Sequence, residues 1–319
     1  MPAAEPPPSL PGQASVTLRA HAGAVSAALF NARGAYVVTA GADRAVRLFS
    51  ARAALDADAA GAAPTQLTTP IKSYAAPASH APLALALAAS DAQLAHGGGD
   101  RNVSLVDVAS GAVLRRFNAH SGAVHALAFA GPGDALLLAA GFDVRVRAYD
   151  LRAQNAWKPV MEMREGRDTI LALAVRGAAL WAAGKEGVVR GYDVRMGELT
   201  EDVIGEPVIS LQASATSLLV SSSSRAAASH RLLSRADGTL QQRLLGHSLT
   251  AGAASRACFA AGEAAVVSGD DEVGMCAWDA RSGDVLRRYA GGTCTFVDAR
   301  QDALLSAHKD GVVRIWRDA

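Results

Sequence analysis

The sequence predicts an all-β fold in which small antiparallel sheets repeat along the chain. Three observations lead to this prediction. Hydrophobic and polar residues alternate in short runs such as AVSAALF and AVHALAF, the pattern of strands with one buried face. Turns with Gly or Asp separate these runs. A similar cadence recurs, as in AGADRAVRLF, AGFDVRVRAY and AGKEGVVRGY, which indicates structural repeats.

Seven anchor positions set the period of the repeat. Each anchor is the aromatic or aliphatic residue that ends the cadence. Successive anchors lie 38 to 57 residues apart, against about 40–45 residues for a four-stranded propeller blade. The anchors are Phe49, Val106, Tyr149, Tyr192, Leu233, Trp278 and Trp316. A four-stranded sheet cannot bury both apolar faces alone, so we expect seven sheets stacked around an axis, a β-propeller.

Each unit contains the signals for four strands in a fixed order. An alternating run follows a His or Gly turn, and a strand of small apolar residues such as YVVTAG or ALLLAAG comes next. After an Asp or Gly turn there is a third, alternating strand such as GVVRIW. A polar turn then leads to a fourth, more polar strand such as DVLRRYA. No stretch shows sustained helical periodicity.

The two ends of the chain complete the predicted ring. The last unit shows three strands, and the segment ASVTLRA (14–20) precedes the first unit. We expect this segment to be the outer strand of the seventh blade, so that the propeller covers residues 14–319. The Pro-rich residues 1–13 are expected to be a disordered tail, and the Ala/Pro/Thr-rich residues 51–70 a loop insertion.

Composition limits the class of protein. The chain has 319 residues, half of them hydrophobic, a net charge of +1 and three cysteines without a close-spaced pair. These features argue against a basic nucleic-acid-binding domain, a disulfide framework and a Cys-rich zinc site. The start of the sequence lacks a secretory pattern, and the most apolar window, PLALALAAS, is far shorter than a membrane span. We expect a soluble protein of the cytoplasm, the nucleus or both.

Histidine and aspartate recur at one place in the units. The sixth unit shows the fullest set, with His247, Ser268, Asp271 and Trp278, although its spacing would also let Glu272 occupy the turn. The partial sets are His21 with Asp43, His80 with Asp100, and His120 with Asp143. In WD repeats such residues form a buried hydrogen-bond network, which avoids a desolvation cost of about 1–3 kcal/mol per polar group. Because the pairs recur once per unit, we interpret them as scaffold rather than as metal ligands or an acid–base pair.

Motifs of catalysis are incomplete. AGKEGV has Glu186 where a phosphate-binding loop needs Ser or Thr, and HGGGD lacks the nucleophile elbow that accompanies an esterase oxyanion hole. We therefore expect no enzyme activity, no cofactor and no metal. A propeller hydrolase remains the less favoured alternative, since it would need clustered His or carboxylate side chains in the channel.

The chain resembles WD40-repeat proteins and, more closely, the mitogen-activated protein kinase organizer family. The segments that carry the closer resemblance are GGGDRNVSLVDVASGAVLRRFNAHSGAVHALAF, AGKEGVVRGYDVRMGELTEDVIGEPVISL and RADGTLQQRLLGH. The resemblance implies a non-catalytic scaffold linked to kinase cascades and to the spliceosome. The sequence departs from the family at the third-strand Trp, which is Phe49 in the first unit and Val106 in the second, and in the longer fifth unit, SSSSRAAASHRLLS.

The turns that carry His and Asp should all lie at one end of the blades and form a binding face. Its candidate partner-binding residues are Arg44, Arg101, Arg167, Asp168, Lys185 and Lys309. Mixed charge with Arg suits protein partners better than nucleic acid. We expect a monomer that joins a larger complex of spliceosome or kinase-cascade proteins.

Two further features leave alternatives open. The Ser-rich stretch Ser221–Ser229 is either a drifting loop or a phosphorylated turn. The tetrapeptides YDLR (149–152), YDVR (192–195) and WDAR (278–281) resemble the motif of propellers that dock on cullin-4 adaptors. The alternative function is therefore that of a substrate receptor for a cullin-4 ubiquitin ligase.

Overall fold

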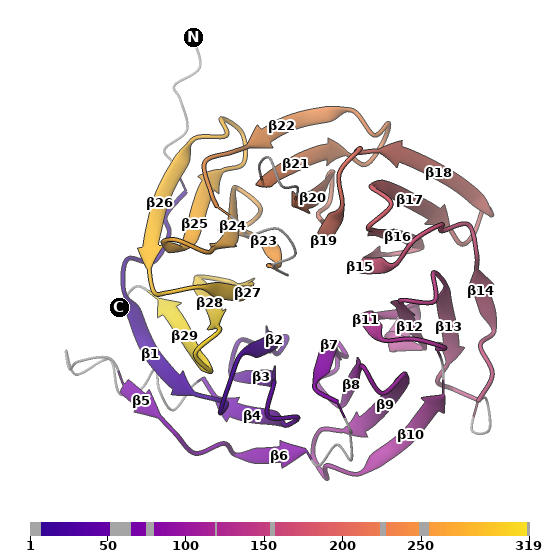
Figure 1. The fold of residues 1–319 in the computed structure, drawn as a ribbon, viewed down its shortest axis with the longest axis horizontal. Coiled ribbons are helices and arrows are strands. Elements are labelled where there is room, and N and C mark those ends of the chain that lie inside the picture. Colours follow the sequence, from indigo (N-terminus) through magenta and orange to yellow (C-terminus); the bar gives the residue numbers. More distant parts are fainter. Residues whose placement is uncertain are drawn as a thin grey trace.

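The structure, a computed structural model, describes residues 8–51, 65–74, 80–118, 120–153, 157–223, 228–248 and 255–317. These residues form seven β-sheets arranged as blades around a central axis (Figure 1). Within the described part, the one helical element is the short 3₁₀ turn η1, Pro132–Asp134. The prediction of an all-β, seven-bladed propeller is confirmed. No helix among the described residues is long and apolar enough to cross a membrane.

The first strand of each blade lines the axis, and the second strand pairs with it in antiparallel fashion (Figure 1). The inner strands of blades 1 to 7 are β2 (Val25–Phe30), β7 (Pro82–Leu87), β11 (Val124–Ala130), β15 (Ile170–Arg176), β19 (Val208–Ala213), β23 (Ala257–Ala260) and β27 (Cys294–Arg300). The second strands are β3 (Tyr36–Gly41), β8 (Gln93–Gly98), β12 (Leu136–Gly141), β16 (Ala179–Gly184), β20 (Ser217–Ser223), β24 (Ala265–Asp270) and β28 (Ala303–His308).

Two more strands extend each sheet outward. The third strands are β4 (Val46–Ser50), β9 (Asn102–Asp107), β13 (Val146–Asp150), β17 (Val188–Asp193), β21 (Ala228–Ser234), β25 (Gly274–Asp279) and β29 (Val312–Arg317). The outer strands are β6 (Lys72–Tyr74), β10 (Val113–Asn118), β14 (Met161–Met163), β18 (Glu198–Val203), β22 (Leu240–Leu244), β26 (Val285–Ala290) and, in blade 7, β1 (Ala14–Arg19). The outer strands are the most polar because one face of each blade edge meets solvent.

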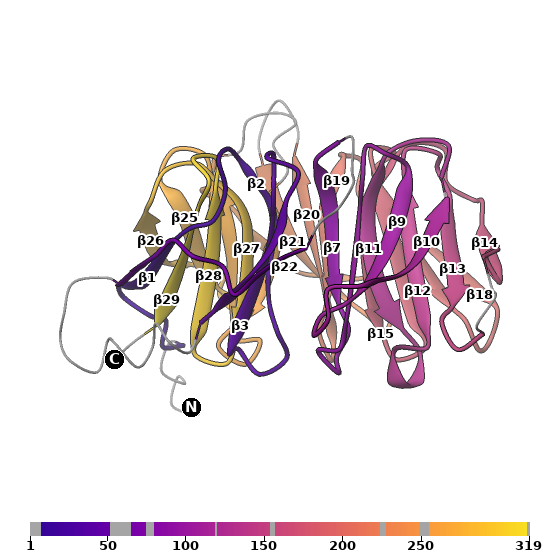
Figure 2. The same ribbon diagram turned by 90° about the horizontal axis from the view of Figure 1, so that it is seen from below.

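Antiparallel pairing divides the turns between two faces of the ring. We call upper face the one with the turns between second and third strands and with the segments leading into the inner strands. The lower face carries the turns between inner and second strands and those between third and outer strands. Figure 2 shows the ring from the side, with the strands running between the two faces.

Seven hydrophobic clusters fill the seven gaps between neighbouring blades, so each sheet buries both of its faces. Every gap contains one anchor from the sequence repeat. Tyr149 of blade 3, for example, packs against Phe117 of blade 2 with ring centroids 4.4 Å apart. Trp278 of blade 6 packs into the cluster that it shares with blade 5, and its side chain is fully buried. The recurring anchor is thus the side chain that each blade inserts toward the preceding one.

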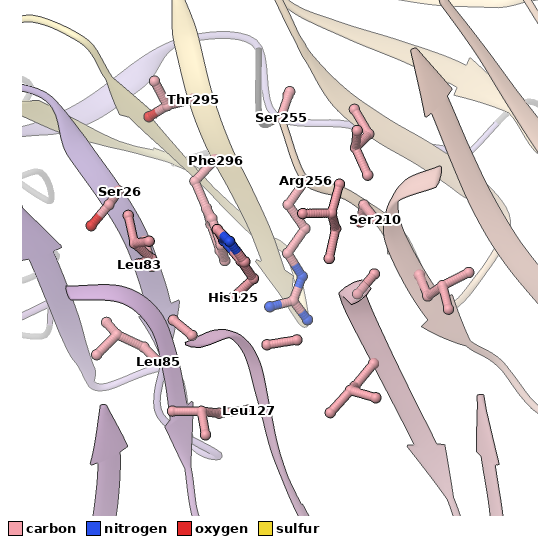
Figure 3. A pocket seen from close by; sticks show the side chains of 18 residues that line it. Ser26, Leu83, Leu85, His125, Leu127, Ser210, Ser255, Arg256, Thr295 and Phe296 are labelled. Atoms are coloured by element: carbon pink, nitrogen blue, oxygen red, sulfur yellow. The ribbon is translucent and has the colours of Figure 1, made fainter. Parts of the chain in front are cut away.

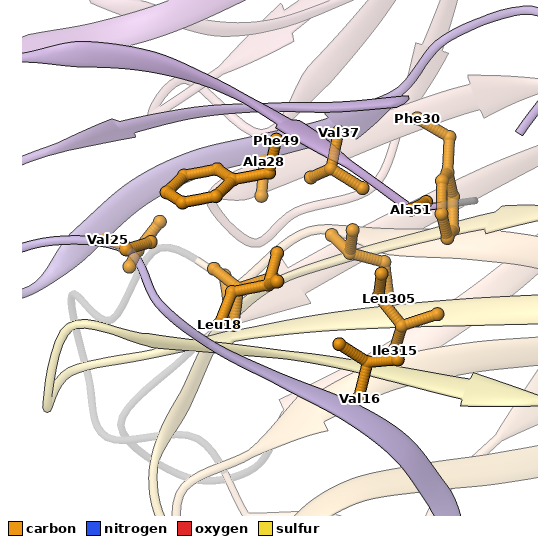
Figure 4. Packing of buried hydrophobic residues seen from close by; sticks show 13 residues of the cluster. Val16, Leu18, Val25, Ala28, Phe30, Val37, Phe49, Ala51, Leu305 and Ile315 are labelled. Carbon is orange, nitrogen blue, oxygen red and sulfur yellow. The ribbon is translucent and has the colours of Figure 1, made fainter. Parts of the chain in front are cut away.

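The N-terminal strand closes the ring. β1 pairs antiparallel with β29, from Ala14 opposite Trp316 to Arg19 opposite Val312. Val16 and Leu18 are fully buried in the cluster between blades 7 and 1, and Figure 4 shows them beside Ile315 and Leu305. This observation confirms the predicted closure. The two ends of the propeller are held together by a sheet and by a shared hydrophobic core.

Parts of the two segments expected to be irregular are ordered. Residues 65–67 of the expected loop insertion form β5 (Thr65–Leu67), which pairs in parallel with β1 and makes blade 7 five-stranded. Leu67 packs against the cluster that contains Val16 and Leu18, which explains why the strand forms there. In the expected tail, Leu10 is buried against blades 6 and 7, and its carbonyl accepts a hydrogen bond from Arg287. Residues 1–7 and 52–64 lie outside the described part.

We expect Leu18→Ala to lower the free energy of unfolding by about 2–5 kcal/mol, because it leaves a cavity in the closing core. The matched control is Arg19→Ala on the same strand, whose exposed side chain should contribute less than about 0.5 kcal/mol. Chemical denaturation followed by tryptophan fluorescence measures both. Equal effects of the two substitutions would contradict the closing role of β1.

Candidate interaction face

The upper-face turn of blade 1 is held by a charged network beneath it. His21 Nδ1 lies 2.7 Å from Asp43 Oδ1, and His21 Nε2 lies 2.8 Å from Thr39 Oγ1. Arg47, on the third strand that follows the turn, donates to Asp43 Oδ2 at 2.6 Å. A Cβ at Gly41 would lie 2.4 Å from His21 Cγ, so only glycine leaves room for the imidazole. Asp43 therefore ties the turn both to His21, in the segment before β2, and to Arg47 on β4.

Blade 3 repeats this network. His120 Nδ1 lies 2.8 Å from Asp143 Oδ1, and Arg147 donates to Asp143 Oδ2 at 2.6 Å. Burial favours the neutral carboxyl, but the hydrogen bonds from His120 and Arg147 outweigh it and hold the pKa of Asp143 well below its usual range. In blade 1, hydrogen bonds from Arg47 and His21 likewise outweigh burial and lower the pKa of Asp43 to about 2. Both carboxylates are therefore ionised at neutral pH.

A recurring arginine is the network member that the sequence analysis missed. It lies on the third strand, at equivalent register positions opposite the second strand, and occurs in five blades: Arg47, Arg147, Arg190, Arg231 and Arg314. The signal was visible in the repeated letters V-R-L, V-R-A and V-R-G of the third strands. Because the residue is charged and lies on an alternating strand, its position in the sequence resembles a solvent-facing one. Its partner is a carboxylate in blades 1, 3, 4 and 5, whereas Arg314 in blade 7 donates to the carbonyl of Gly291 at 2.8 Å.

In blades 4 and 5, whose units lack the turn His, a glutamate pairs with the recurring arginine. Glu186 accepts two hydrogen bonds from Arg190, at 2.7 and 2.8 Å, and one from the backbone N–H of Arg167 at 3.0 Å. In blade 5 Glu206 accepts from Ser222 Oγ at 2.8 Å and from Arg231 at 3.2 Å. The longer Glu side chain spans the distance that Asp and His cover together in blades 1 and 3.

Blade 2 has a second imidazole, His96, near the predicted pair of His80 and Asp100. His80 is exposed and lies over Gly99, whereas the charge of Asp100 acts on His96, a buried residue of β8. Burial lowers the pKa of His96 to about 4, with the Asp100 charge opposing that shift. The imidazole inside this blade therefore comes from a strand rather than from the turn.

The sixth blade differs from the network predicted for it. Asp270, not Asp271 or Glu272, holds the turn, because its carboxylate accepts backbone N–H groups of Ser248, Glu272 and Val273.

The other predicted members of the sixth blade also have different partners. The Trp278 indole donates to the carbonyl of Leu245 at 2.8 Å, and Ser268 Oγ donates to the carbonyl of Gly269. His247 stacks on His230, with ring centroids 4.2 Å apart. Aromatic packing across the gap between blades 5 and 6 thus replaces the predicted hydrogen-bond chain.

The fullest Trp–Ser–His chain lies in blade 7, where no His was expected. The Trp316 indole donates to Ser306 Oγ at 2.9 Å, and Ser306 Oγ lies 2.9 Å from His308 Nε2. His308 ends β28, at the register position that Gly41 occupies in blade 1. A Cβ at Gly41 would lie 2.4 Å from His21, so a His at this position of the second strand and a His in the preceding turn exclude each other.

These networks support exposed charged side chains at the upper face. All six candidate residues are exposed and come from four blades: Arg44, Arg101, Arg167, Asp168, Lys185 and Lys309. Arg44 and Arg101 occupy the same turn position, with φ of 64° and 65°. Lys185 lies close enough to the axis that its charge, together with burial, lowers the pKa of His125. The arrangement presents charges around the channel mouth.

The central channel is lined by the inner strands (Figure 3). Its wall is mostly aliphatic and hydroxyl-bearing, and the Arg256 guanidinium lies 5.2 Å from the centroid of the Phe296 ring. His125 is the titratable group facing it, and the described lining includes no carboxylate. Among the described residues there is also no group of three or more His, Cys, Asp or Glu placed to hold a metal ion.

The Ser-rich stretch of blade 5 is strand rather than turn over its described part. Ser221, Ser222, Ser223 and Ser229 are buried on β20 and β21. Ser221 Oγ lies 2.9 Å from His230 Nδ1, and Ser222 Oγ lies 3.0 Å from Ser229 Oγ. The hydroxyls of Ser221, Ser222 and Ser229 therefore take part in hydrogen bonds inside the blade, and residues 224–227 lie outside the described part.

The three tetrapeptides lie at turns of the lower face, where their aspartates shape the backbone. Asp150, Asp193 and Asp279 each accept the backbone N–H of the Arg two residues later, at 2.7–2.9 Å. The Arg152 guanidinium also donates two hydrogen bonds to the Asp150 carboxylate. Turn formation therefore accounts for the aspartates of the pattern.

Asp43→Asn should lower the free energy of unfolding by roughly 2 kcal/mol at pH 7, since one pKa unit corresponds to about 1.4 kcal/mol. The folded-state pKa of about 2 lies below the usual value of 3.8, so the contribution is present above pH 4 and is lost as the pH falls toward 2. Denaturation of both proteins between pH 7 and 2 measures it. A difference that stays constant over that range would contradict the assignment.

His96→Gln should weaken the acid sensitivity of the fold. The folded-state pKa of about 4 lies below the usual 6.5, so the unfolded chain binds a proton first and stability falls as the pH drops from about 6.5 to 4. Removing this group should reduce that fall by at most roughly 3 kcal/mol. Melting temperatures across this range test the prediction, which an unchanged pH profile would refute.

Comparisons with known proteins agree with this architecture. The model of the WD domain, G-beta repeat, matches residues 12–50, which correspond to the closing strand β1 followed by the first three strands of blade 1. The WD repeat domain-containing protein 83 of Rattus norvegicus is 39% identical over 51 residues, and the match spans 16% of this chain and 16% of the rat protein. The chain is therefore a seven-bladed β-propeller that carries a WD repeat, an architecture suited to binding protein partners.

Proposed function

We propose that this protein is a non-enzymatic scaffold that holds partner proteins in a multiprotein assembly through its upper face. The observation that supports this proposal is the set of exposed charged turns contributed by four blades, of which those of blades 1 and 4 are held by ion pairs beneath them. Binding residues on rigid supports lose little conformational entropy when a partner docks. Arg side chains are also frequent among the residues that dominate binding energy.

Three more specific assemblies follow from the sequence resemblances. The similarity to the mitogen-activated protein kinase organizer family favours kinase-cascade or spliceosome proteins as partners, in the cytoplasm or the nucleus. The rat relative that matches residues of this chain is described only as a WD repeat domain-containing protein. The cullin-4 adaptor is the alternative partner, and it would use the lower-face tetrapeptides instead of the upper face.

The double substitution Arg101→Glu with Lys185→Glu should reduce partner recovery at least about ten-fold, because it reverses two charges at the channel mouth. Affinity purification with quantitative mass spectrometry compares it with the wild type. The matched control is Arg19→Glu, a charge reversal on the outer strand β1. Equal loss in the control, or no loss in the double variant, would contradict an upper-face site.

The identity of the proteins lost in the double variant separates the assemblies. Splicing factors would support a ribonucleoprotein role, and kinases a signalling scaffold. A cullin-4 adaptor that is retained by the double variant but lost on joint replacement of Arg152, Arg195 and Arg281 would support the ligase alternative. An adaptor that binds unchanged after that triple replacement would exclude the tetrapeptides as its site.

A further inference from the structure

The lower face carries an open groove between blades 1 and 2. The groove has a volume of about 870 Å³ and adjoins a pocket of about 280 Å³ between blades 7 and 1. Arg33, in the turn between β2 and β3, lines both of them. We call the two together the arginine groove. It lies on the face opposite to Arg44, Arg101 and Lys185.

The groove is apolar because the outer strand of blade 1 is short. β6 pairs only with Val46, Arg47 and Leu48 of β4, so the lower part of the blade has no fourth strand over it. Tyr36 and Ile71 line the opening with 44% and 58% of their surfaces exposed. Burying side chains of this size is favourable by about 1.5–3 kcal/mol each, so a partner that covers them gains binding free energy.

The rim of the groove is positively charged. Arg33, Arg300 and Arg317 are exposed and line the same pocket, and within the described part of the chain none of them forms an ion pair. The carboxylates of the lining are Asp302 and Asp91. Both oxygens of Asp91 are already bound, by Asn31 Nδ2 at 2.7 Å and by the Ala32 N–H at 2.9 Å.

A second groove at the equivalent position provides an internal comparison. Between blades 3 and 4, Val160 takes the place of Ile71, since each precedes a short outer strand and donates its N–H to the third strand. That groove has the same apolar character, but Arg195 and Asp134 balance its charge. The additional arginines of the groove near blade 1, Arg300 and Arg317, come from its adjoining pocket.

We propose that the arginine groove docks an acidic, amphipathic segment of a partner protein. Apolar side chains of the segment would cover Tyr36 and Ile71, and its carboxylates would pair with Arg33 and Arg300. An amphipathic helix laid into an apolar groove is an established mode of peptide recognition, and complementary charge fixes its orientation. The scaffold would then hold one partner on each face, and the lower site does not depend on the upper one.

The test uses two labelled synthetic peptides of about four helical turns, long enough to cover the groove. Both carry Leu and Ile on one face, and the opposite face is Glu in one peptide and Lys in the other. Fluorescence anisotropy with the full chain should show binding of the Glu peptide alone. Ile71→Asp and Arg33→Glu should each raise the Kd of the Glu peptide by at least roughly ten-fold, which corresponds to about 1.4 kcal/mol of binding free energy.

Two control substitutions locate the site. Val160→Asp makes the same change in the equivalent groove, and Arg44→Glu reverses a charge on the upper face. Neither should change the Kd by more than about two-fold. Circular dichroism confirms that each variant is folded, so that lost binding is not lost structure.

Several results would overturn the proposal. They are equal binding of the Lys peptide, an equal effect of Val160→Asp or Arg44→Glu, and the absence of binding to the wild type. Concentration-dependent dimerisation that Ile71→Asp abolishes would identify a second copy of the chain as the occupant. A third variant has residues 52–64 replaced by a Gly-Ser linker of equal length. Tighter binding of the Glu peptide to this variant than to the wild type would identify residues 52–64 of the chain itself as the occupant.

Discussion

Burial of both faces of every sheet is the constraint on which this structure depends. A sheet of four short strands has two apolar faces and no second layer of its own. Here each face meets the neighbouring blade, and one large anchor side chain from each blade fills the gap toward the preceding blade. The arrangement works only as a closed ring, because an open end would expose one whole face. The pairing of β1 with β29 is therefore required for the stability of all seven blades.

The polar networks meet a second requirement, which is to hold the turns of a blade without leaving buried charge unpaired. Blades 1 and 3 use His, Asp and Arg, blade 4 uses Glu and Arg, and blade 7 uses Trp, Ser and His. These are different chemical solutions to one geometric problem. An account based on a single consensus of residues therefore recognises only some of them.

The two faces of the ring offer different surfaces to partners. The upper face presents exposed cations on turns of four blades, around a channel whose wall carries His125 and Arg256. The lower face presents the arginine groove, where a shortened outer strand leaves aromatic and aliphatic side chains uncovered. A molecule with two such surfaces can bring two proteins into proximity without any chemistry of its own, which is the proposed scaffold role.

The sequence by itself determined the strands, their order, the number of blades and the closing role of β1, because these follow from local alternation and from the spacing of the anchors. It also identified the pairs His21–Asp43 and His120–Asp143, whose letters recur at a fixed interval. Only the tertiary structure decided which partners the remaining polar residues take. Asp270 rather than Asp271, His308 in place of a turn His, and Arg47 with its counterparts depend on which groups come within hydrogen-bond distance of one another in the folded blade. Spacing along the chain describes the backbone period. A hydrogen bond, in contrast, forms only within a narrow range of donor–acceptor distances, and the folded blade sets those distances.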